Sequence, residues 1–347
     1  MSVSRAPVTL LTGFLGAGKT TLLNAILSDA SSGRMAVIVN EFGEAGLDHD
    51  LIETSRDEVV LLPSGCLCCT VRGDLSQTMM RLLDRRAAGK FDFDRIVIET
   101  TGLADPGPIL QTMLADRDLA LAVRMDGVVT VVDAVNGPAT MDAQFEAVSQ
   151  VAMADMIVLS KTDLVADTAP FEARLRSLNA TAPIVHSVKG KGLGQTLWGL
   201  SGLHPDVEPE QALRWMTPQA DPLANLSGLK PAAPDPALFS PHDTRIGTAS
   251  IVLEEPLEDE VFDNWLNTLI ALRGEDILRV KGIVFLKGLE TPFVFHGVQH
   301  VFDPPLPVKN WQGEDRRSRI VVIARDLSGS ALQASLDTLR APHGPQG

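Results

Sequence analysis

The amino-acid sequence predicts an α/β fold with a mostly parallel sheet, followed by a smaller C-terminal α+β domain. In the first half of the chain, short apolar runs alternate with helix-like segments, which is the pattern of strands joined by crossover helices. A glycine-rich motif stands between the first apolar run and the first helix-like segment. The length of 347 residues exceeds the usual size of one hydrophobic core and therefore favours two domains.

The glycine-rich motif follows the apolar run 8–11 and precedes the helix-like segment 21–27. It satisfies the pattern GxxxxGK[ST] in the strand, loop and helix context that supports a phosphate-binding loop. Backbone N–H groups of such a loop turn toward the phosphates, the lysine neutralises the β and γ oxygens, and the Ser/Thr hydroxyl binds Mg²⁺. The sequence therefore predicts a P-loop NTPase. The expected nucleotide-binding residues of the loop are Gly13, Gly16, Ala17, Gly18, Lys19, Thr20 and Thr21.

An acidic residue closes the later apolar run 95–98. This residue is Glu99, and Gly102 follows three positions later. The arrangement is typical of a carboxylate on the Mg²⁺ side of a nucleotide and of a loop that senses the γ-phosphate. We therefore expect Glu99 and Thr20 to hold magnesium, and Lys19, Glu99 and Gly102 to be catalytic.

Two more apolar runs, 35–39 and 59–62, predict strands whose carboxyl ends face the ligand. Glu41 follows the first of them. It is either a surface carboxylate or a catalytic switch residue that contacts Mg²⁺, water or a second metal ion.

The apolar runs 128–133 and 156–159 predict further strands, and the amphipathic segment 141–152 lies between them. The second run leads into Ser160-Lys161-Thr162-Asp163, which is close to the Asn-Lys-x-Asp pattern by which GTPases recognise guanine. A carboxylate at Asp163 can accept hydrogen bonds from N1–H and the exocyclic amine of guanine, and the stem of Lys161 can cover the ring. These two residues predict GTP as the nucleotide, although Ser160 stands where asparagine is usual.

The chain has three cysteines, Cys66, Cys68 and Cys69. They lie between the run 59–62 and a helix expected from Asp74. Thiolates suit soft ions such as Zn²⁺ and Cu(I), whereas a closed structural zinc site needs a fourth ligand and usually two separated pairs. A three-thiolate site with an exchangeable position is the interpretation that we adopt. A redox pair or small apolar fillers are the alternatives.

Composition narrows the function classes. Lys and Arg number 30 against 44 Asp and Glu, a formal charge of −14, which argues against nucleic-acid binding. Charges and glycines interrupt the apolar runs well before the ~20 residues of a membrane helix. Because the clustered cysteines have no distant thiol with which to pair, a reducing cytoplasm is the expected location.

The second half of the chain begins with a stretch rich in Pro, Gly and Ala. We expect a P-loop GTPase domain with the metal site at 1–188, a linker or loosely ordered connection at 189–245, and an α+β domain at 246–347. Strands are expected at 249–253, 283–286, 293–301 and 320–324, with helices at 261–270 and after Gly329. The sheet of this domain is expected to be antiparallel. His242, His296 and His300 are interpreted as polar or packing residues.

These motifs together resemble the CobW-type family of metal-handling P-loop GTPases. The matching segments are 13–24, Asn40-Glu41-Phe42-Gly43, Gly65-Cys66-Leu67-Cys68-Cys69-Thr70, 99–106, 160–163, 279–282 and 297–300. The resemblance implies slow hydrolysis of GTP to GDP and phosphate, a need for magnesium, and delivery of zinc or cobalt to a client metalloenzyme or metal-insertion complex. A histidine-rich run found in many members is reduced here to Ser240-Pro241-His242-Asp243.

The motifs leave two other functions open. One is a P-loop kinase or ATPase with a purely structural zinc knuckle, and the other is a nucleotide-gated scaffold. The oligomeric state is open between a monomer and a homodimer.

Overall fold

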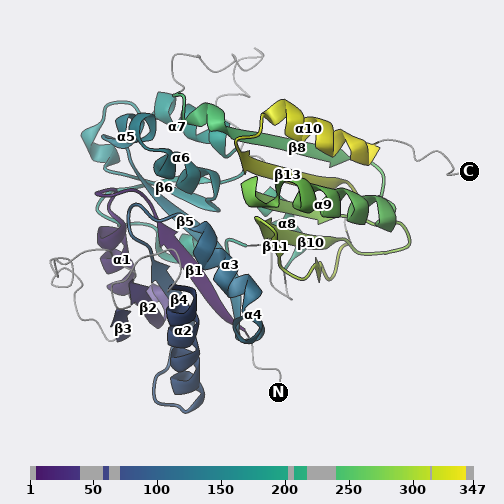
Figure 1. Cartoon of the computed structure of the whole chain (residues 1–347). Coiled ribbons are helices and arrows are strands. Elements are labelled where there is room, and N and C mark those ends of the chain that lie inside the picture. The colour runs from purple at the N-terminus through teal and green to yellow at the C-terminus, as the bar shows by residue number, and fades with distance from the viewer. Residues whose placement is uncertain are drawn as a thin grey trace, which may run out of the picture.

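The computed structural model describes residues 5–39, 58–61, 71–201, 207–216, 240–312 and 315–340 (Figure 1). These residues form two sheets, each with helices packed against it. The N-terminal sheet carries the glycine-rich loop, and the C-terminal sheet lies beside it.

The first sheet is parallel throughout the described part of the chain, as predicted. Its strand order is β3-β2-β4-β1-β5-β6-β7. The carboxyl ends of its strands therefore meet at one edge. The strands are β1 (Ala6–Thr12), β2 (Met35–Val39), β3 (Glu58–Leu61), β4 (Arg95–Glu99), β5 (Val123–Asp133), β6 (Met156–Ser160) and β7 (Ile184–Ser187).

Helices cover both faces of this sheet. Helix α1 packs on one face, and α2, α3, α6 and α7 pack on the other. The helices are α1 (Lys19–Leu27), α2 (Val71–Ala87), α3 (Gly107–Ala115), α4 (Arg117–Ala122), α5 (Gly137–Ala143), α6 (Phe145–Ala152) and α7 (Ala169–Leu178).

In the first domain, the following predicted elements differ from the structure. The segment 141–152 is not one helix, because Gln144 adopts an extended conformation between α5 and α6. The helix expected from Asp74 begins earlier, at Val71. Strand β5 begins at Val123, five residues before the apolar run, because its polar residue Asp126 is buried and receives hydrogen bonds from Arg124 and from the backbone of Gly199.

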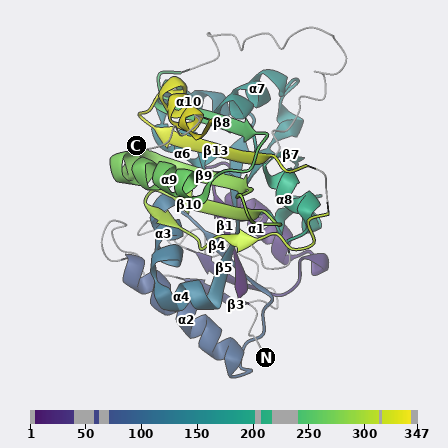
Figure 2. The same ribbon diagram turned by 90° about the vertical axis from the view of Figure 1, so that its right-hand side faces the viewer.

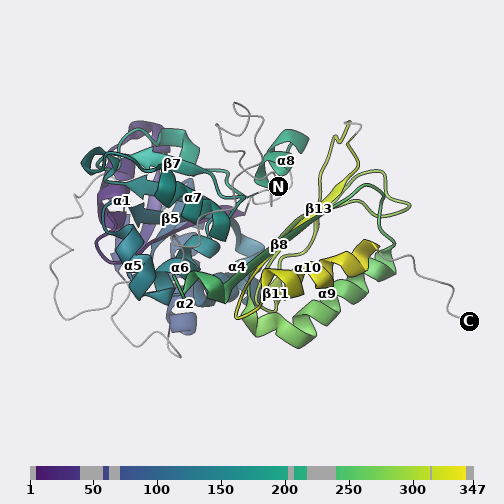
Figure 3. The ribbon, with the colours of Figure 1, turned by 90° about the horizontal axis from the view of Figure 1, so that it is seen from above.

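The second sheet is antiparallel, which confirms the prediction for the C-terminal domain. Its order is β11-β10-β9-β13-β8, and β12 pairs with β10. Helices α9 (Asp259–Arg273) and α10 (Gly329–Asp337) cover its outer face, as Figure 3 shows. The strands are β8 (Ile246–Leu253), β9 (Ile277–Val284), β10 (Phe293–Val298), β11 (Val301–Phe302), β12 (Leu306–Pro307) and β13 (Ser318–Arg325). The single strand expected at 293–301 is instead β10, a turn that contains His300, and β11.

The inner face of the second sheet packs against the first domain (Figure 2). One hydrophobic cluster joins β1, β4, α2 and α3 to β9, β10 and β13. Helix α8 (Pro209–Met216) belongs to the stretch 189–245 that was expected to be a linker, and its Trp215 and Met216 are buried in the same cluster. The two domains therefore share a core.

Candidate functional site

The glycine-rich loop connects β1 to α1 and needs glycine for two physical reasons. Gly13 has φ 139°, and a Cβ atom there would lie 2.2 Å from the carbonyl oxygen of Val131 in β5. Gly18 has φ 102° and directly precedes the first residue of α1. The loop is thus pressed against the sheet and ends at a helix N-terminus, where free N–H groups favour an anion.

Lys19 and Thr20 begin α1. The Lys19 ammonium donates to the carbonyl oxygens of Gly13 at 2.8 Å and Phe14 at 3.3 Å, so the charge lies over the loop. Thr21, the third nucleotide-binding residue predicted in this helix, is exposed in the first helical turn. An open pocket of about 440 Å³ runs along α1 from Thr21 to the loop 189–194.

Thr20 and Glu99 meet at the carboxyl edge of the sheet. The Thr20 hydroxyl donates to Glu99 Oε1 at 2.9 Å, and Glu99 is buried at the end of β4. The next residue, Thr100, donates its N–H to Leu11 of β1 at 2.9 Å, which fixes the two strand ends side by side. A hydroxyl and a carboxylate are the hard oxygen donors that Mg²⁺ prefers, so the residues present fit this ion.

Gly102 lies in the loop after β4 and packs directly on the glycine-rich loop. A Cβ atom at Gly102 would lie 2.5 Å from the backbone nitrogen of Leu15. The structure thus brings Gly102 beside the P-loop. The Gly102 loop is itself held by Gln150 of α6, whose side-chain amide donates to the carbonyl oxygens of Gly102 and Ala104. Sequence reasoning missed Gln150, although a glutamine among the apolar positions of 147–152 was a usable signal.

The predicted guanine segment also lies at this edge. The Ser160 hydroxyl donates to the carbonyl oxygen of Ala17 at 2.6 Å, and the Lys161 ammonium donates to that of Gly16 at 2.9 Å. Asp163 is exposed in the 3-10 turn Thr162–Leu164. The segment is therefore attached to the glycine-rich loop.

Asp133 anchors Lys161 and was not predicted as a site residue. The distance from Lys161 Nζ to Asp133 Oδ2 is 2.6 Å. Burial alone would raise the pKa of Asp133, but hydrogen bonds from Lys161, Asn136 and Val135 outweigh it and bring the pKa below its usual value. The available signal was an acidic residue that closes an apolar strand, as Glu99 does.

Other predicted residues lie outside the described residues. They are Glu41 and the three cysteines Cys66, Cys68 and Cys69. Strands β2 and β3, which precede them, end at Val39 and Leu61 on the same sheet edge as β4 and β1. In the part of the chain that the structure describes, no group of three or more His, Cys, Asp and Glu residues is placed to hold a metal ion. The same residues contain no helix long and apolar enough to span a bilayer.

A family model described as the CobW/HypB/UreG nucleotide-binding domain matches residues 7–186. The chain belongs to this family. A second model, the C-terminal domain of the cobalamin synthesis protein cobW, matches residues 246–340. Together the two matches confirm the resemblance expected from the motifs.

Similar proteins come from bacteria and yeast. The chain is 33% identical to the zinc chaperone YjiA of Escherichia coli, over 96% of this chain and 98% of that protein. It is 34% identical to the zinc-regulated GTPase metalloprotein activator 1 of Schizosaccharomyces pombe, over 92% of this chain and 82% of that protein. The prediction of a GTPase is thus confirmed for this CobW family member.

The crystal structure of the Zn(II)-bound YjiA GTPase from Escherichia coli matches with a TM-score of 0.70 at 30% identity, covering 97% of this chain and 99% of that chain. This match confirms the predicted fold. A triple variant of YjiA, with one glutamate and two cysteines replaced by alanine, is also a Zn(II)-bound structure and matches with a TM-score of 0.72.

Proposed function

We propose that this protein is a GTP-hydrolysing metallochaperone that binds Zn²⁺ at Cys66, Cys68 and Cys69 and passes the ion to a client metalloenzyme. The observation that carries the proposal is the meeting of the glycine-rich loop, the β4 end and the segment 160–163 at one sheet edge, in a chain that is 33% identical to a zinc chaperone over nearly its whole length. The names of the relatives favour zinc over cobalt as the ion.

For nucleotide binding, we assign one role to each group of residues at the carboxyl edge of the first sheet. The loop N–H groups and Lys19 bind the phosphates, and Asp163 accepts from the guanine edge while the stem of Lys161 lies along the ring. Asp133 keeps the Lys161 ammonium directed at the P-loop. Competition between GTP and ATP tests this assignment, and equal affinities would refute guanine recognition.

Hydrolysis depends on the same edge. Thr20 and Glu99 would hold Mg²⁺, which when bound supplies positive charge to the β and γ oxygens. Gly102 packs on Leu15 of the P-loop, so its loop is placed to respond to the γ-phosphate. Replacing Lys19 by alanine is expected to abolish hydrolysis, and an unchanged rate would refute the phosphate-loop assignment.

The proposed zinc site rests on the chemistry of thiolates and on the position of the cysteines in the sequence. Three clustered thiolates bind Zn²⁺ while leaving a position that another ligand can take. The cysteines follow β3, whose carboxyl end lies on the edge where nucleotide would bind. We propose that loss of the γ-phosphate changes this edge and weakens the hold on the ion.

The test compares two variants in both nucleotide states. Because a YjiA variant lacking two cysteines still appears with Zn(II), the measurement must be affinity and stoichiometry, obtained by competition with a chromophoric chelator. Cys68→Ala is expected to weaken Zn²⁺ binding at least tenfold while GTP still binds. Lys19→Ala serves as the reciprocal control, because it should retain one tightly bound Zn²⁺ and lose hydrolysis. Undiminished Zn²⁺ affinity in Cys68→Ala would refute the cargo site, and equal zinc release with GTP and GDP would refute the coupling.

A further inference from the structure

We propose that Gln150 and Arg279 are positioning residues for GTP hydrolysis, through which the C-terminal domain holds the loop 102–104 against the glycine-rich loop. The inference rests on the proposed function, since it concerns the same hydrolysis. It assigns a task to the C-terminal domain, which supplies none of the nucleotide-binding residues described above.

The first half of the connection is the buried amide of Gln150. Its Nε2 lies 3.2 Å from the carbonyl oxygen of Gly102 and 3.0 Å from that of Ala104. Two carbonyl oxygens can accept only from the NH₂ group, so the orientation of this amide is fixed. The backbone oxygen of Gln150 accepts from the Thr130 hydroxyl of β5 at 2.9 Å. Gln150 thus fastens the loop that contacts Leu15 to helix α6.

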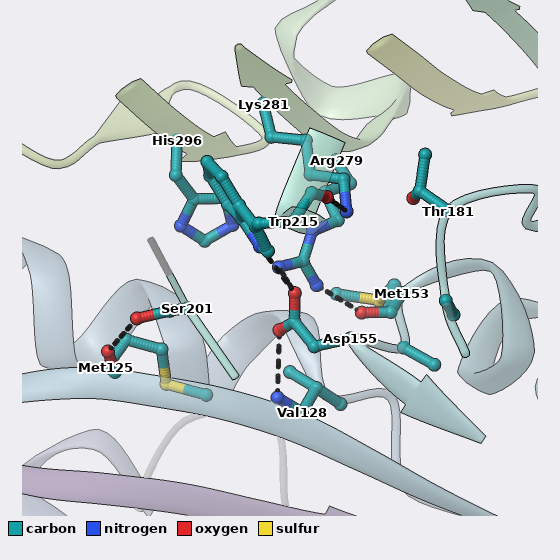
Figure 4. Close-up of polar contacts among 12 residues, drawn as sticks. Met125, Val128, Met153, Asp155, Thr181, Ser201, Trp215, Arg279, Lys281 and His296 are labelled. Carbon is teal, nitrogen blue, oxygen red and sulfur yellow. Dashed lines mark hydrogen bonds and ion pairs between the residues drawn. The ribbon is translucent and has the colours of Figure 1, made fainter. Parts of the chain in front are cut away.

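The second half lies just beyond the end of α6. Arg279 of β9 donates to the carbonyl oxygen of Met153 and to Asp155 Oδ1 (Figure 4). The side chains of Arg279 and Asp155 are only 3% and 1% exposed. Asp155 Oδ2 also accepts from the N–H of Val128 in β5 at 2.9 Å, and its Oδ1 accepts from Trp215 Nε1 of α8 at 3.1 Å. The C-terminal sheet is therefore attached to the first domain at the end of α6.

The path between Gln150 and the contact of Arg279 with Met153 is short and is fixed by further hydrogen bonds. Gln150 and Met153 are three residues apart, which corresponds to about 4.5 Å along a helix axis. Asn179 fixes the same helix end, since its side-chain amide donates to the carbonyl oxygens of Val151, Ala152 and Ala154. Arg279 therefore adds a contact from the C-terminal domain to the same braced helix end from which Gln150 reaches the loop.

A second contact ties the other side of this loop to the C-terminal domain. Asp105 accepts from the N–H of Gly107 at 2.8 Å and so starts α3 directly after the loop. One turn later, Gln111 of α3 donates to Gln299 in the turn between β10 and β11. Both ends of the segment that follows β4 are thus in contact with C-terminal residues, one through α6 and one through α3.

The test measures GTP hydrolysis and GDP affinity in the full-length protein. Gln150→Met keeps the side-chain length but removes the donor, and Arg279→Lys keeps the charge but removes the paired donation. Each is expected to lower kcat for GTP at least tenfold, since misplacement of a catalytic loop by about 1 Å costs on the order of 100-fold. The affinity for GDP, which has no γ-phosphate, should stay within about twofold.

Two matched variants control for the chemistry of each change. Gln211→Met removes a side-chain amide that donates to the Gly199 carbonyl oxygen at 2.9 Å, away from the nucleotide edge. Arg317→Lys alters an exposed paired donation to Asp315 at 3.0 Å. Both controls should hydrolyse GTP at the parent's rate.

The double variant distinguishes one shared pathway from two separate defects. Because both residues act on the same loop, combining Gln150→Met with Arg279→Lys should cost little more than the worse single change. The inference is overturned if Gln150→Met has the same kcat for GTP as the parent. It is also overturned if the affinity of the variant for GDP falls by the same factor as its kcat. If Arg279→Lys fails to fold, Gln150→Met tests the contact of α6 with the loop, and Gln299→Met, which removes the acceptor for Gln111, tests the contribution of the C-terminal domain: parental kcat in either variant would overturn the inference. If the parent protein does not hydrolyse GTP, both the proposed function and this inference are overturned. If the parent hydrolyses GTP and Gln150→Met and Arg279→Lys have the same kcat as the parent, only this inference is overturned.

Discussion

Lys281 should make the stability of the protein rise with pH. It lies in β9 with only 2% of its surface exposed, and its ammonium donates to the carbonyl oxygen of Trp215 at 3.0 Å. Burial and the neighbouring Arg279 charge lower the pKa of Lys281 from 10.5 to about 7, although Asp155 acts in the opposite direction. Folding therefore costs the free energy of removing a proton from Lys281 whenever the solution pH lies between these two values.

The sign and size of this pH dependence of the unfolding free energy follow from proton linkage. Between about pH 7 and pH 10.5 the unfolded chain keeps a proton on Lys281 that the folded chain has lost, so the unfolding free energy increases with pH. The limiting slope is about 1.4 kcal/mol per pH unit, and raising the pH from 7 to 9 should add about 2 kcal/mol. Below about pH 7 both states are protonated and the contribution becomes constant. Lys281→Met removes the titrating group and with it this dependence.

Urea unfolding at several pH values, followed by tryptophan fluorescence, measures the effect. The decisive quantity is the unfolding free energy of the parent minus that of Lys281→Met. Lys287→Met is the matched control, because Lys287 is exposed and its pKa is raised by Glu258, so it keeps its proton throughout this range. A difference between parent and Lys281→Met that stays flat or falls from pH 7 to pH 9 would refute the reasoning.

Three further variants test other parts of the structure. Gly102→Ala places a methyl group 2.5 Å from the backbone nitrogen of Leu15, so the loop must move and kcat for GTP should fall about tenfold or more in a phosphate-release assay, and an unchanged rate would contradict this packing. Asp163→Asn should reduce the preference for GTP over ATP in competition binding, which would be unaffected if this residue lay away from the base. Arg174→Met leaves the buried carboxylate of Asp243 without its paired donors at 2.7 and 3.1 Å, and should lower the unfolding free energy by about 3 kcal/mol in a denaturant titration, whereas an unchanged midpoint would show that the pair contributes nothing.

The local sequence was sufficient to predict an element wherever a single physical requirement determines its residues. The run 35–39 is buried along its whole length, as strands of a parallel sheet must be, and it forms β2 as expected. Gly13 and Gly18 stand where only glycine fits the backbone, so the loop motif could be recognised from spacing alone. The outer helix of the second domain was predicted for a similar reason, since Phe262, Trp265 and Leu269 all face its core.

The local sequence was insufficient to predict a strand whose buried charged residues have partners far away in the sequence. Arg279 and Lys281 interrupt the apolar run of β9, so the strand expected at 283–286 begins instead at Ile277. Both side chains are buried because Asp155 and Trp215 meet them, from positions 124 and 66 residues earlier in the chain. Pattern reasoning treats lysine and arginine as solvent-facing, and only the packing of the two sheets reveals their partners.

The shared hydrophobic cluster has a consequence for how the chain is synthesised and divided. Residues of β9, β10 and β13 complete a core that begins with β1, so a fragment ending near residue 188 would expose apolar surface of α3 and leave Asp155 without Arg279. Such a fragment should associate or unfold, and the intact chain should melt in a single transition. We therefore expect the first domain to reach its stable packing only after β9, β10 and β13 have been synthesised.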